Sequence, residues 1–177
     1  MNFYGRRFNL YLLLMLALAL VSGCAMFKNW NPQVAALRIH IESGANVPGV
    51  SETIPVMRND PVMVQIATEP ILTEANIVAA GLIETPGGFA VEVKFDQSGS
   101  WTLEQFSAMN PGKHFVIFGQ WGEKLVNGRW LAAPSITRRM ATGTLAFTPD
   151  ASRAEAEQLV KGLNVAAKNY AAAKMKQ

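Results

Sequence analysis

The chain has 177 residues, of which 50% are hydrophobic, and a formal net charge of +3 at pH 7. Arg6 and Arg7 lie in a segment that we expect to be removed. The remaining charge of about +1 gives no reason to expect nucleic-acid binding. The single cysteine leaves no partner for a disulfide within the chain, and the length suits one domain.

The N-terminus has the pattern of a bacterial lipoprotein signal. The two arginines precede an apolar run at 10–21, which is too short to span a bilayer. The sequence Val-Ser-Gly-Cys at 21–24 then resembles a lipobox, in which the chain is cleaved between Gly23 and Cys24 and the cysteine is lipidated. An ordinary signal peptide or a short anchor is the alternative interpretation.

We therefore predict a signal peptide at 1–23 and a tether at 24–34, with acyl chains, palmitate among them, on Cys24. Three acyl chains would hold the protein on a membrane without a transmembrane helix. Ala25 stands where an aspartate would favour the inner membrane, so the outer membrane is favoured if the host is Gram-negative. The predicted location is the cell envelope, facing the periplasm, with the membrane as a partner through the lipid anchor.

Strands are predicted where apolar and polar residues alternate, or where short apolar runs end at turn residues. They cover 35–43, 53–58, 62–68, 82–84, 89–95, 114–120, 131–136 and 140–147. The alternation is most regular at 89–95, and the apolar run at 114–120 predicts a central strand. A polar hairpin loop is predicted at 121–128.

Two helices are predicted between the strands. Thr73 is the expected N-cap of a short helix, because its side chain can accept a hydrogen bond from the first turn. A longer helix is expected at 100–109, where the sequence Asn-Pro-Gly stops it. Its predicted buried residues are Trp101, Phe106 and Met109.

A third helix is predicted after Ser152, which forms a capping box with Glu155. Its expected apolar face consists of Leu159, Val160, Leu163, Ala167 and Tyr170. The order of elements predicts an α+β fold, a mainly antiparallel sheet with helices packed on one face. We expect one domain at 35–172 and a frayed tail at 173–177.

An ordered set of short motifs spans 70–165. In chain order they are Leu-Thr-Glu-Ala-Asn-Ile at 72–77, Gly112-Lys113 before the apolar strand 115–118, Ala-Pro-Ser-Ile at 133–136, Gly143, Phe147-Thr148, Glu155-Ala156 and Leu159. This set resembles the periplasmic P1 region, the head subdomain, of the SecD or SecDF protein-export subunit. The resemblance implies the α+β fold of that subdomain and an ability to contact polypeptide.

The sequence departs from that family at three places. Ala146 replaces a family glycine, the hairpin at 121–128 is longer, and the chain ends where the family enters a membrane helix. Export coupling in the family depends on ionisable residues in transmembrane helices, so the resemblance does not imply the motor function here.

Neither a catalytic constellation nor a metal site is predicted. His40 and His114 lie in predicted strands without further ligands at metal-binding spacing. The sequence has no nucleophile elbow, and the Gly-Gly pair at 87–88 is interpreted as a turn rather than a phosphate-binding loop. Glu84 and Glu92 are interpreted as solvated strand residues. The chain is therefore predicted not to be an enzyme and to need no cofactor.

Several side chains have two interpretations. Trp121 and Trp130 flank the hairpin and are candidate protein-contact residues if exposed, although a role in the core or hairpin is favoured. Arg138 and Arg139 suit either an anionic group or a solvated turn. Met57, Met63, Met109 and Met140 suit either an adaptable binding surface or core filling, and core filling is favoured at each of them.

The favoured hypothesis is a non-catalytic, lipid-anchored envelope protein that binds polypeptide or an envelope protein in connection with protein export. Its partners would include exported polypeptide or Sec proteins, and no nucleic acid. The alternative is a structural or assembly module of an envelope complex that uses a sheet edge and binds no client peptide.

Overall fold

The structure, a computed structural model, describes residues 34–175. The predicted signal peptide, the cleavage site at Gly23 and Cys24, and all of the tether except Val34 lie outside the described residues. The lipid anchor and its membrane therefore stay predictions. Among the residues that are described, neither α-helix is both long enough and apolar enough to cross a bilayer.

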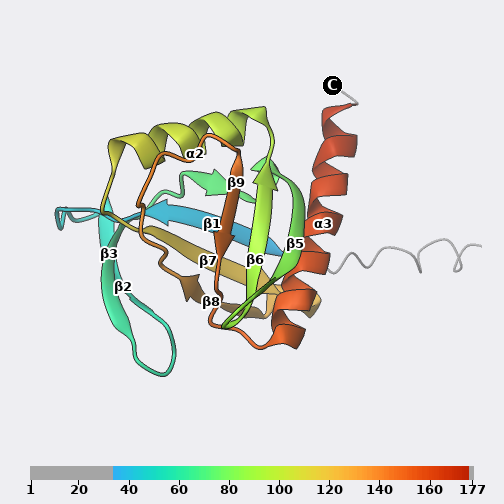
Figure 1. Cartoon of the computed structure of the whole chain (residues 1–177), viewed down its shortest axis with the longest axis horizontal. Helices are drawn as coiled ribbons and strands as arrows, with labels where there is room; N and C mark the ends of the chain where they lie inside the picture. The colour runs from blue at the N-terminus through green and yellow to red at the C-terminus, as the bar shows by residue number, and fades with distance from the viewer. Residues whose placement is uncertain (1–33, 176–177) are drawn as a thin grey trace, which may run out of the picture. The chain divides into compact units, whose positions relative to one another are not determined.

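The described residues form strands, two α-helices and two short 3-10 turns, labelled as in Figure 1. They are β1 (Ala36–Ile41), β2 (Ser51–Val56), β3 (Val62–Ala67), β4 (Leu72–Thr73), η1 (Glu74–Asn76), β5 (Ile77–Thr85), β6 (Gly88–Phe95), α2 (Gln97–Met109), β7 (Phe115–Trp121), η2 (Glu123–Leu125), β8 (Asn127–Ala132), β9 (Thr144–Phe147) and α3 (Arg153–Lys174).

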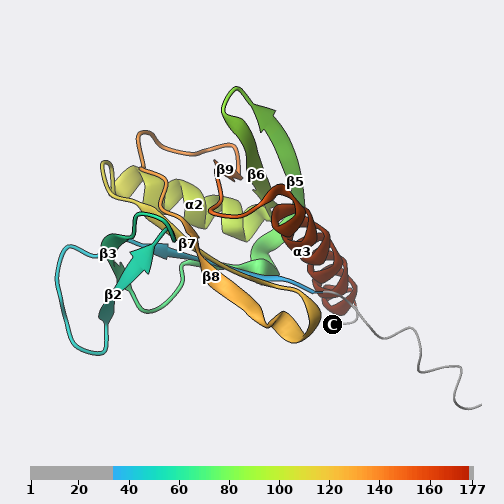
Figure 2. The ribbon, with the colours of Figure 1, turned by 90° about the horizontal axis from the view of Figure 1, so that it is seen from below.

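The strands pair only in antiparallel fashion, in three sheets. A four-stranded sheet has the order β4-β1-β7-β8, a three-stranded sheet has the order β5-β6-β9, and β2 pairs with β3 alone. The predicted α+β class with antiparallel strands is confirmed, and β7, predicted to be central, lies between β1 and β8. Figures 1 and 2 show the β2–β3 pair and α3 at opposite ends of the domain.

The main hydrophobic core lies between the four-stranded and three-stranded sheets and under α3. Alternate residues of β1 and β7, such as Leu37 and Ile117, face it from one side, while Val91 and Val93 of β6 face it from the other. The opposite face of the four-stranded sheet contributes Val116 to a cluster with the β2–β3 pair. That second, smaller cluster consists of Ile54, Val56, Val64, Ile66 and Val116.

The capping box at the start of α3 is confirmed. The Ser152 hydroxyl accepts from the Glu155 backbone N–H, and the Ser152 backbone N–H donates to Glu155 Oε2 at 2.8 Å. Of the predicted apolar face, Tyr170 is 39% exposed and therefore lies outside the core. The helix continues to Lys174, whose Nζ lies 2.8 Å from Asp96 Oδ2, so the start of the tail predicted to fray is helical.

The predicted burial of α2 is wrong at two residues. Trp101 is 64% exposed and Met109 is 68% exposed, whereas the helix buries Gly99, Leu103 and Ser107 at four-residue spacing. A side chain at Gly99 would place its Cβ within 3.0 Å of neighbouring side chains, so the helix approaches closely there. Leu103 is therefore the large apolar residue of the buried stripe, and Phe106 is partly buried beside it, while Trp101 and Met109 face outwards.

Most predicted elements differ from the structure by a few residues at their ends, and four differ more. The short helix expected after Thr73 is the single 3-10 turn Glu74–Asn76, and the strand expected at 82–84 begins at Ile77. The strand expected at 131–136 ends at Ala132, before Pro134, and the strand expected at 140–147 begins only after Gly143. Gly143 has φ +67°, a left-handed conformation that interrupts a strand and favours glycine.

Candidate functional site

The β2–β3 ribbon, defined here as residues 51–67, exposes three large apolar side chains. Met57, Val62 and Met63 are 49%, 55% and 62% exposed, and they cluster around the turn between the two strands. The ribbon also buries apolar residues against the back of the four-stranded sheet. The inward face is filled by this packing, so the apolar residues at the turn are left for contact with something other than the core.

A cavity of about 620 Å³ lies on this ribbon. Its apolar wall comes from the ribbon turn, and its opposite wall comes from the chain just after β1 and before β7. The lining residues are Glu42, Ser43, Gly44, Val56, Met57, Val62, Met63, Val64, Gln65, His114 and Ala133. The volume lies within the range of about 300–1,000 Å³ typical of ligand pockets.

One end of the cavity is polar. His114 Nδ1 lies 2.7 Å from Glu42 Oε2, and the His114 backbone N–H donates to the same oxygen at 3.0 Å. The Glu42 backbone N–H donates in turn to the His114 carbonyl at 3.0 Å. The carboxylate is held in a fixed orientation while its side chain stays about one-third exposed, so it is available to accept a hydrogen bond from a ligand.

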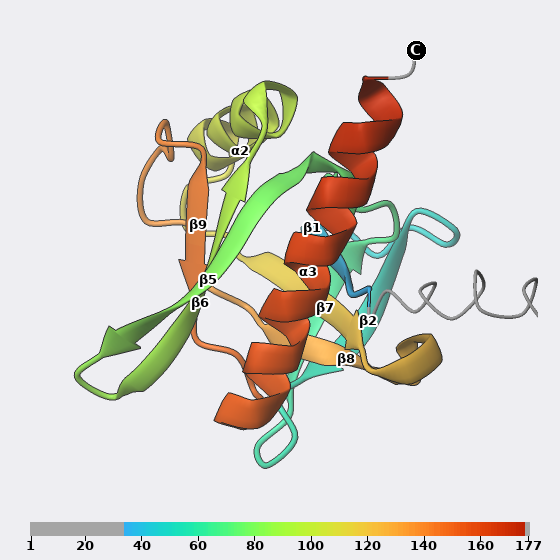
Figure 3. The same ribbon diagram turned by 90° about the vertical axis from the view of Figure 1, so that its right-hand side faces the viewer.

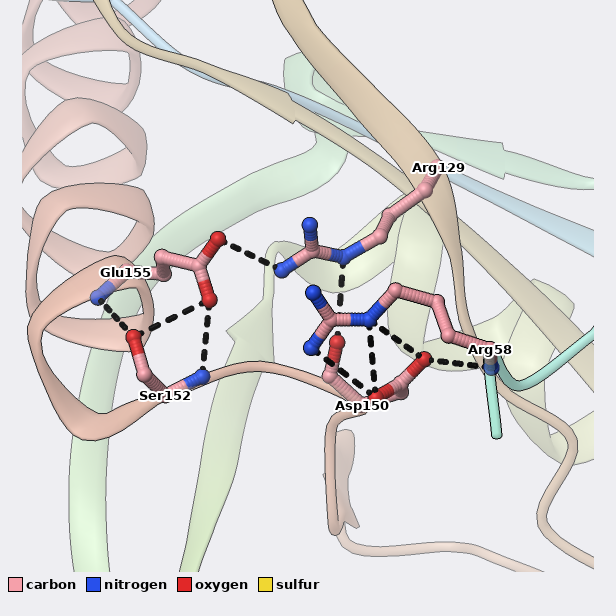
Figure 4. A network of polar contacts seen from close by, with 5 residues as sticks. All are labelled: Arg58, Arg129, Asp150, Ser152 and Glu155. Carbon is pink, nitrogen blue, oxygen red and sulfur yellow. Dashed lines mark hydrogen bonds and ion pairs between the residues drawn. The ribbon is translucent and has the colours of Figure 1, made fainter. Parts of the chain in front are cut away.

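An ion pair positions the cavity end of the ribbon (Figure 4). Arg58 Nε and Nη2 each lie 3.2 Å from oxygens of Asp150, and the Arg58 backbone N–H donates to Asp150 Oδ2 at 2.8 Å. Burial would raise the pKa of Asp150, but the hydrogen bonds from Arg58 outweigh burial and lower it. The adjoining Met57 has φ +71°, which is rare for a residue with a side chain.

The same network reaches α3 through a second arginine (Figure 4). Arg129 Nε donates to the Asp150 carbonyl at 3.0 Å, and Nη2 lies 2.7 Å from Glu155 Oε1. The hydrogen bond from Arg129, followed by the backbone hydrogen bond from Ser152, lowers the pKa of Glu155 to about 2. The ribbon, β8 and the start of α3 are therefore joined by one network of charged groups.

The structure does not bring Trp121 and Trp130 together. Trp121 is 1% exposed and faces the main core, with the Arg129 guanidinium 4.8 Å from its ring centroid. Trp130 is half-buried on the opposite face of the sheet, in edge contact with His40 and Phe118 at 5.3 and 5.1 Å. An exposed tryptophan pair is therefore not formed, and the two residues stabilise separate layers.

The two histidines have separate surroundings. His40 Nδ1 lies 2.9 Å from the Ala67 carbonyl, and burial lowers the pKa of its imidazole. His114 belongs to the cavity just described. Within residues 34–175 no group of three potential metal ligands comes together. Glu84 pairs with Arg153 at 2.8 Å, and Glu92 is exposed on β6, as expected of solvated strand residues.

Sequence reasoning missed this cavity because core filling was the favoured interpretation of Met57 and Met63. A usable signal was present in the sequence. Three apolar residues, Met57, Val62 and Met63, flank the turn Asn-Asp-Pro at 59–61, where two strands leave too little neighbouring chain to bury them. Apolar residues at the tip of an isolated ribbon are a sign of an exposed contact surface.

An antiparallel α+β domain with an exposed apolar ribbon cavity is the class that the fold and the site define. Neither a family model nor a curated protein sequence matches the chain. A solved structure of SecDF, described as a membrane component that enhances protein export, is 20% identical and aligns with a TM-score of 0.52 over 76% of this chain. SecDF in its super-membrane-facing form is also 20% identical, with a TM-score of 0.53 over 76% of this chain.

The chain has the fold of these SecDF structures, as the resemblance in the sequence predicted. It spans 64% of the first of them and 19% of the second. At this level of identity the likeness establishes the fold.

Proposed function

We propose that this chain is a non-catalytic, lipid-anchored envelope protein whose ribbon cavity binds an extended polypeptide segment in connection with protein export. The exposed cavity of about 620 Å³ at Met57 and Met63 is the observation that carries the proposal. The shared fold supports it, because the SecDF structures belong to a membrane component that enhances protein export. The lipobox at Cys24 supports the envelope location.

The chemistry of the cavity suits a polypeptide of varied sequence. Methionine side chains are flexible and polarisable, so Met57 and Met63 can adjust to different apolar side chains. The polar end supplies one fixed carboxylate, Glu42, which can accept a backbone N–H of an extended segment. Apolar contacts would then supply affinity, and the carboxylate would orient the bound backbone.

A non-catalytic role is supported by where the perturbed groups lie. The most strongly shifted carboxyl, Glu155, is paired with Arg129 at the start of α3 and does not line the cavity. A catalytic acid or base would be expected inside the cavity with a strongly shifted pKa and access to a substrate. The charged network instead positions the ribbon.

Site-specific photo-crosslinking in intact envelopes tests polypeptide binding. A photoreactive residue in place of Met63 should capture newly exported polypeptides, and the same residue in place of Lys161, exposed on α3, should not. Equal capture from both positions would refute the cavity as the binding site. Capture of a single stoichiometric envelope protein and no client chains would instead favour the assembly role.

A fractionation experiment tests the anchor separately. The native chain should incorporate labelled palmitate and sediment with membranes, whereas Cys24→Ser should be unlabelled and should not sediment. Separation of inner and outer membranes then tests the predicted outer-membrane location. If Cys24→Ser sediments like the native chain, the lipobox interpretation is wrong. The crosslinking test at Met63 is independent of that result.

A further inference from the structure

Free strand edges are natural sites for strand addition, and the edges of this domain are protected unequally. On β2 the edge residue Pro55 is opposite Met63 and lacks an N–H. The Gln65 carbonyl of β3 accepts from Ser43 N–H, so the backbone groups of Gln65 point away from β2. Backbone groups alternate in direction along paired strands, so those of Met63 and its partner Pro55 also point away from the pair. Proline there prevents an added strand from receiving a hydrogen bond.

The outer edge of β5 is closed by a side chain. Asn164 of α3 accepts from the Ala80 backbone N–H at 3.0 Å and donates to the Ala80 carbonyl at 2.9 Å. The amide occupies both backbone groups that a further strand would use. Figure 3 shows α3 lying alongside β5, which covers this edge of the three-stranded sheet. In the four-stranded sheet, the Leu131 carbonyl of the edge strand β8 accepts from Asp150 N–H at 2.7 Å.

The outer edge of β9 is open. Phe95 N–H donates to the Gly143 carbonyl, and the register pairs Val93 with Leu145, so these residues bond inwards to β6. The backbone groups of Thr144 and Ala146 therefore point away from β6. Neither residue has a backbone hydrogen bond on that side among the described residues. The strand β9 has the sequence Thr-Leu-Ala-Phe, which includes neither a charged residue nor a proline of the kind that protects strand edges.

A slot of about 550 Å³ runs along this open edge. One wall is β9 itself, and the other is the chain segment that precedes it, which Figure 3 shows on the side of β9 away from β6. The lining residues are Glu92, Arg138, Arg139, Met140, Ala141, Thr142, Thr144, Leu145 and Ala146. The slot therefore combines unpaired backbone groups with two arginines.

The charges of the slot indicate what it would accept. Arg139 pairs with Glu104 of α2, whereas exposed Arg138 has no acidic partner among residues 34–175. Glu92 lies on the exposed face of β6 two residues before Lys94, which is exposed on the same face and of opposite sign. Glu92 has no ion pair among residues 34–175 either, so the lining carries two positive charges and one negative charge, and its net positive charge comes from the wall opposite β9.

We propose that the open edge of β9 is a strand-addition site for an extended polypeptide segment that carries an acidic side chain. The segment would pair its backbone with Thr144 and Ala146, and its carboxylate would bind Arg138. This surface is separate from the ribbon cavity, and the inference does not depend on the function proposed for that cavity. We assign the segment to a partner protein of the envelope, because an acidic side chain at one fixed position requires a defined sequence, which exported chains do not share.

Peptide binding to the full lipidated chain in detergent tests the site. The probe is a fluorescent peptide of alternating valine and threonine with one central glutamate, and the comparison peptide carries lysine instead. Ala146→Pro removes the outward N–H without touching the bonds to β6, and should weaken the glutamate peptide about tenfold. Arg138→Glu should reverse the preference between the peptides, whereas Lys161→Glu, the same charge change on α3, should not.

A glutamate peptide with a methylated backbone nitrogen gives the same test without altering the protein, should Ala146→Pro fail to fold. It should bind at least tenfold more weakly than its parent. Equal binding of the methylated and parent peptides would overturn the proposal. So would loss of binding in Met63→Asn but not in Ala146→Pro, because the peptide would then occupy the ribbon cavity. Crosslinking from Thr144 in envelopes should capture one stoichiometric partner protein, and capture of many exported chains instead would contradict this assignment.

Discussion

The two faces of the four-stranded sheet differ in how much they bury. The face towards α3 contributes to a large core with fully buried residues such as Leu131 and Ile117, whereas the other face contacts the β2–β3 ribbon through a small cluster around Val116. The ribbon depends further on an exposed ion pair, Arg58 with Asp150. Stability is therefore concentrated on one face, and the other is free to carry exposed apolar residues for binding.

The largest loss of stability is expected from a substitution in the well-packed face. Leu163→Ala, at a residue with 0% exposure on α3, should lower the unfolding free energy by about 2–5 kcal/mol, because a cavity replaces packed atoms. Met63→Ala, at a residue 62% exposed on the ribbon, should change it by less than about 0.5 kcal/mol and reduce polypeptide capture. Urea unfolding of both variants measures the contrast, and equal costs would contradict it.

A smaller effect is expected where α3 closes the β5 edge. Asn164→Ala should cost about 2–3 kcal/mol, since both backbone groups of Ala80 lose their partner beside the helix. Asn169→Ala, an exposed change on the same helix, is the matched control and should be nearly neutral. Thermal unfolding compares them, and an Asn164→Ala midpoint equal to that of the control would show that water replaces the amide.

The sequence predicted the well-packed side of the molecule better than the ribbon side. The capping box of Ser152 and Glu155, the central strand β7 and the antiparallel α+β class all follow from local patterns and are confirmed. Local patterns are sufficient there because period and capping act within a few residues along the chain. The resemblance in the motifs also predicted the fold that the SecDF structures share.

What the sequence could not predict depends on contacts between distant segments. Gly99 and Ser107 are buried on α2 because the helix packs closely against its neighbours, and this turns Trp101 outwards. The exposed ribbon cavity likewise depends on how many strands flank β2 and β3, which no local period reveals. The lipid anchor at Cys24 rests on sequence pattern alone and remains a prediction.

The charged network that joins the ribbon to α3 should make the free energy of unfolding depend on pH in the acid range. Because the pKa of Glu155 is lowered from 4.5 to about 2 by Arg129, the folded state binds fewer protons than the unfolded state in this range. Its contribution to stability is complete above about pH 4.5 and is lost as the pH falls towards 2. Denaturant unfolding across this range should therefore show decreasing stability.

Glu155→Gln tests that contribution. The variant should lose about 1–2 kcal/mol at pH 7, allowing for screening of a partly exposed pair, and its stability should fall less steeply with acid. Glu157→Gln, an exposed change on the same helix without an ion pair within residues 34–175, is the control. Asp150 and Asp96 also have lowered pKa values, so the stability of Glu155→Gln should still decrease with falling pH, but less than that of the native chain.

The smallest global effect, and the sharpest local one, should come from Arg58→Ala. Removing the guanidinium frees the ribbon turn from Asp150, but the main core is untouched, so unfolding of the whole domain should change little. Hydrogen exchange should nevertheless accelerate in β2 and β3 while β5 and β6 stay protected, because the ribbon can open alone. Arg153→Ala, which removes the exposed pair with Glu84, should leave exchange in the ribbon unchanged. If Arg58→Ala exchanges like the native chain, the small cluster at Val116 alone holds the ribbon and the ion pair has no positioning role.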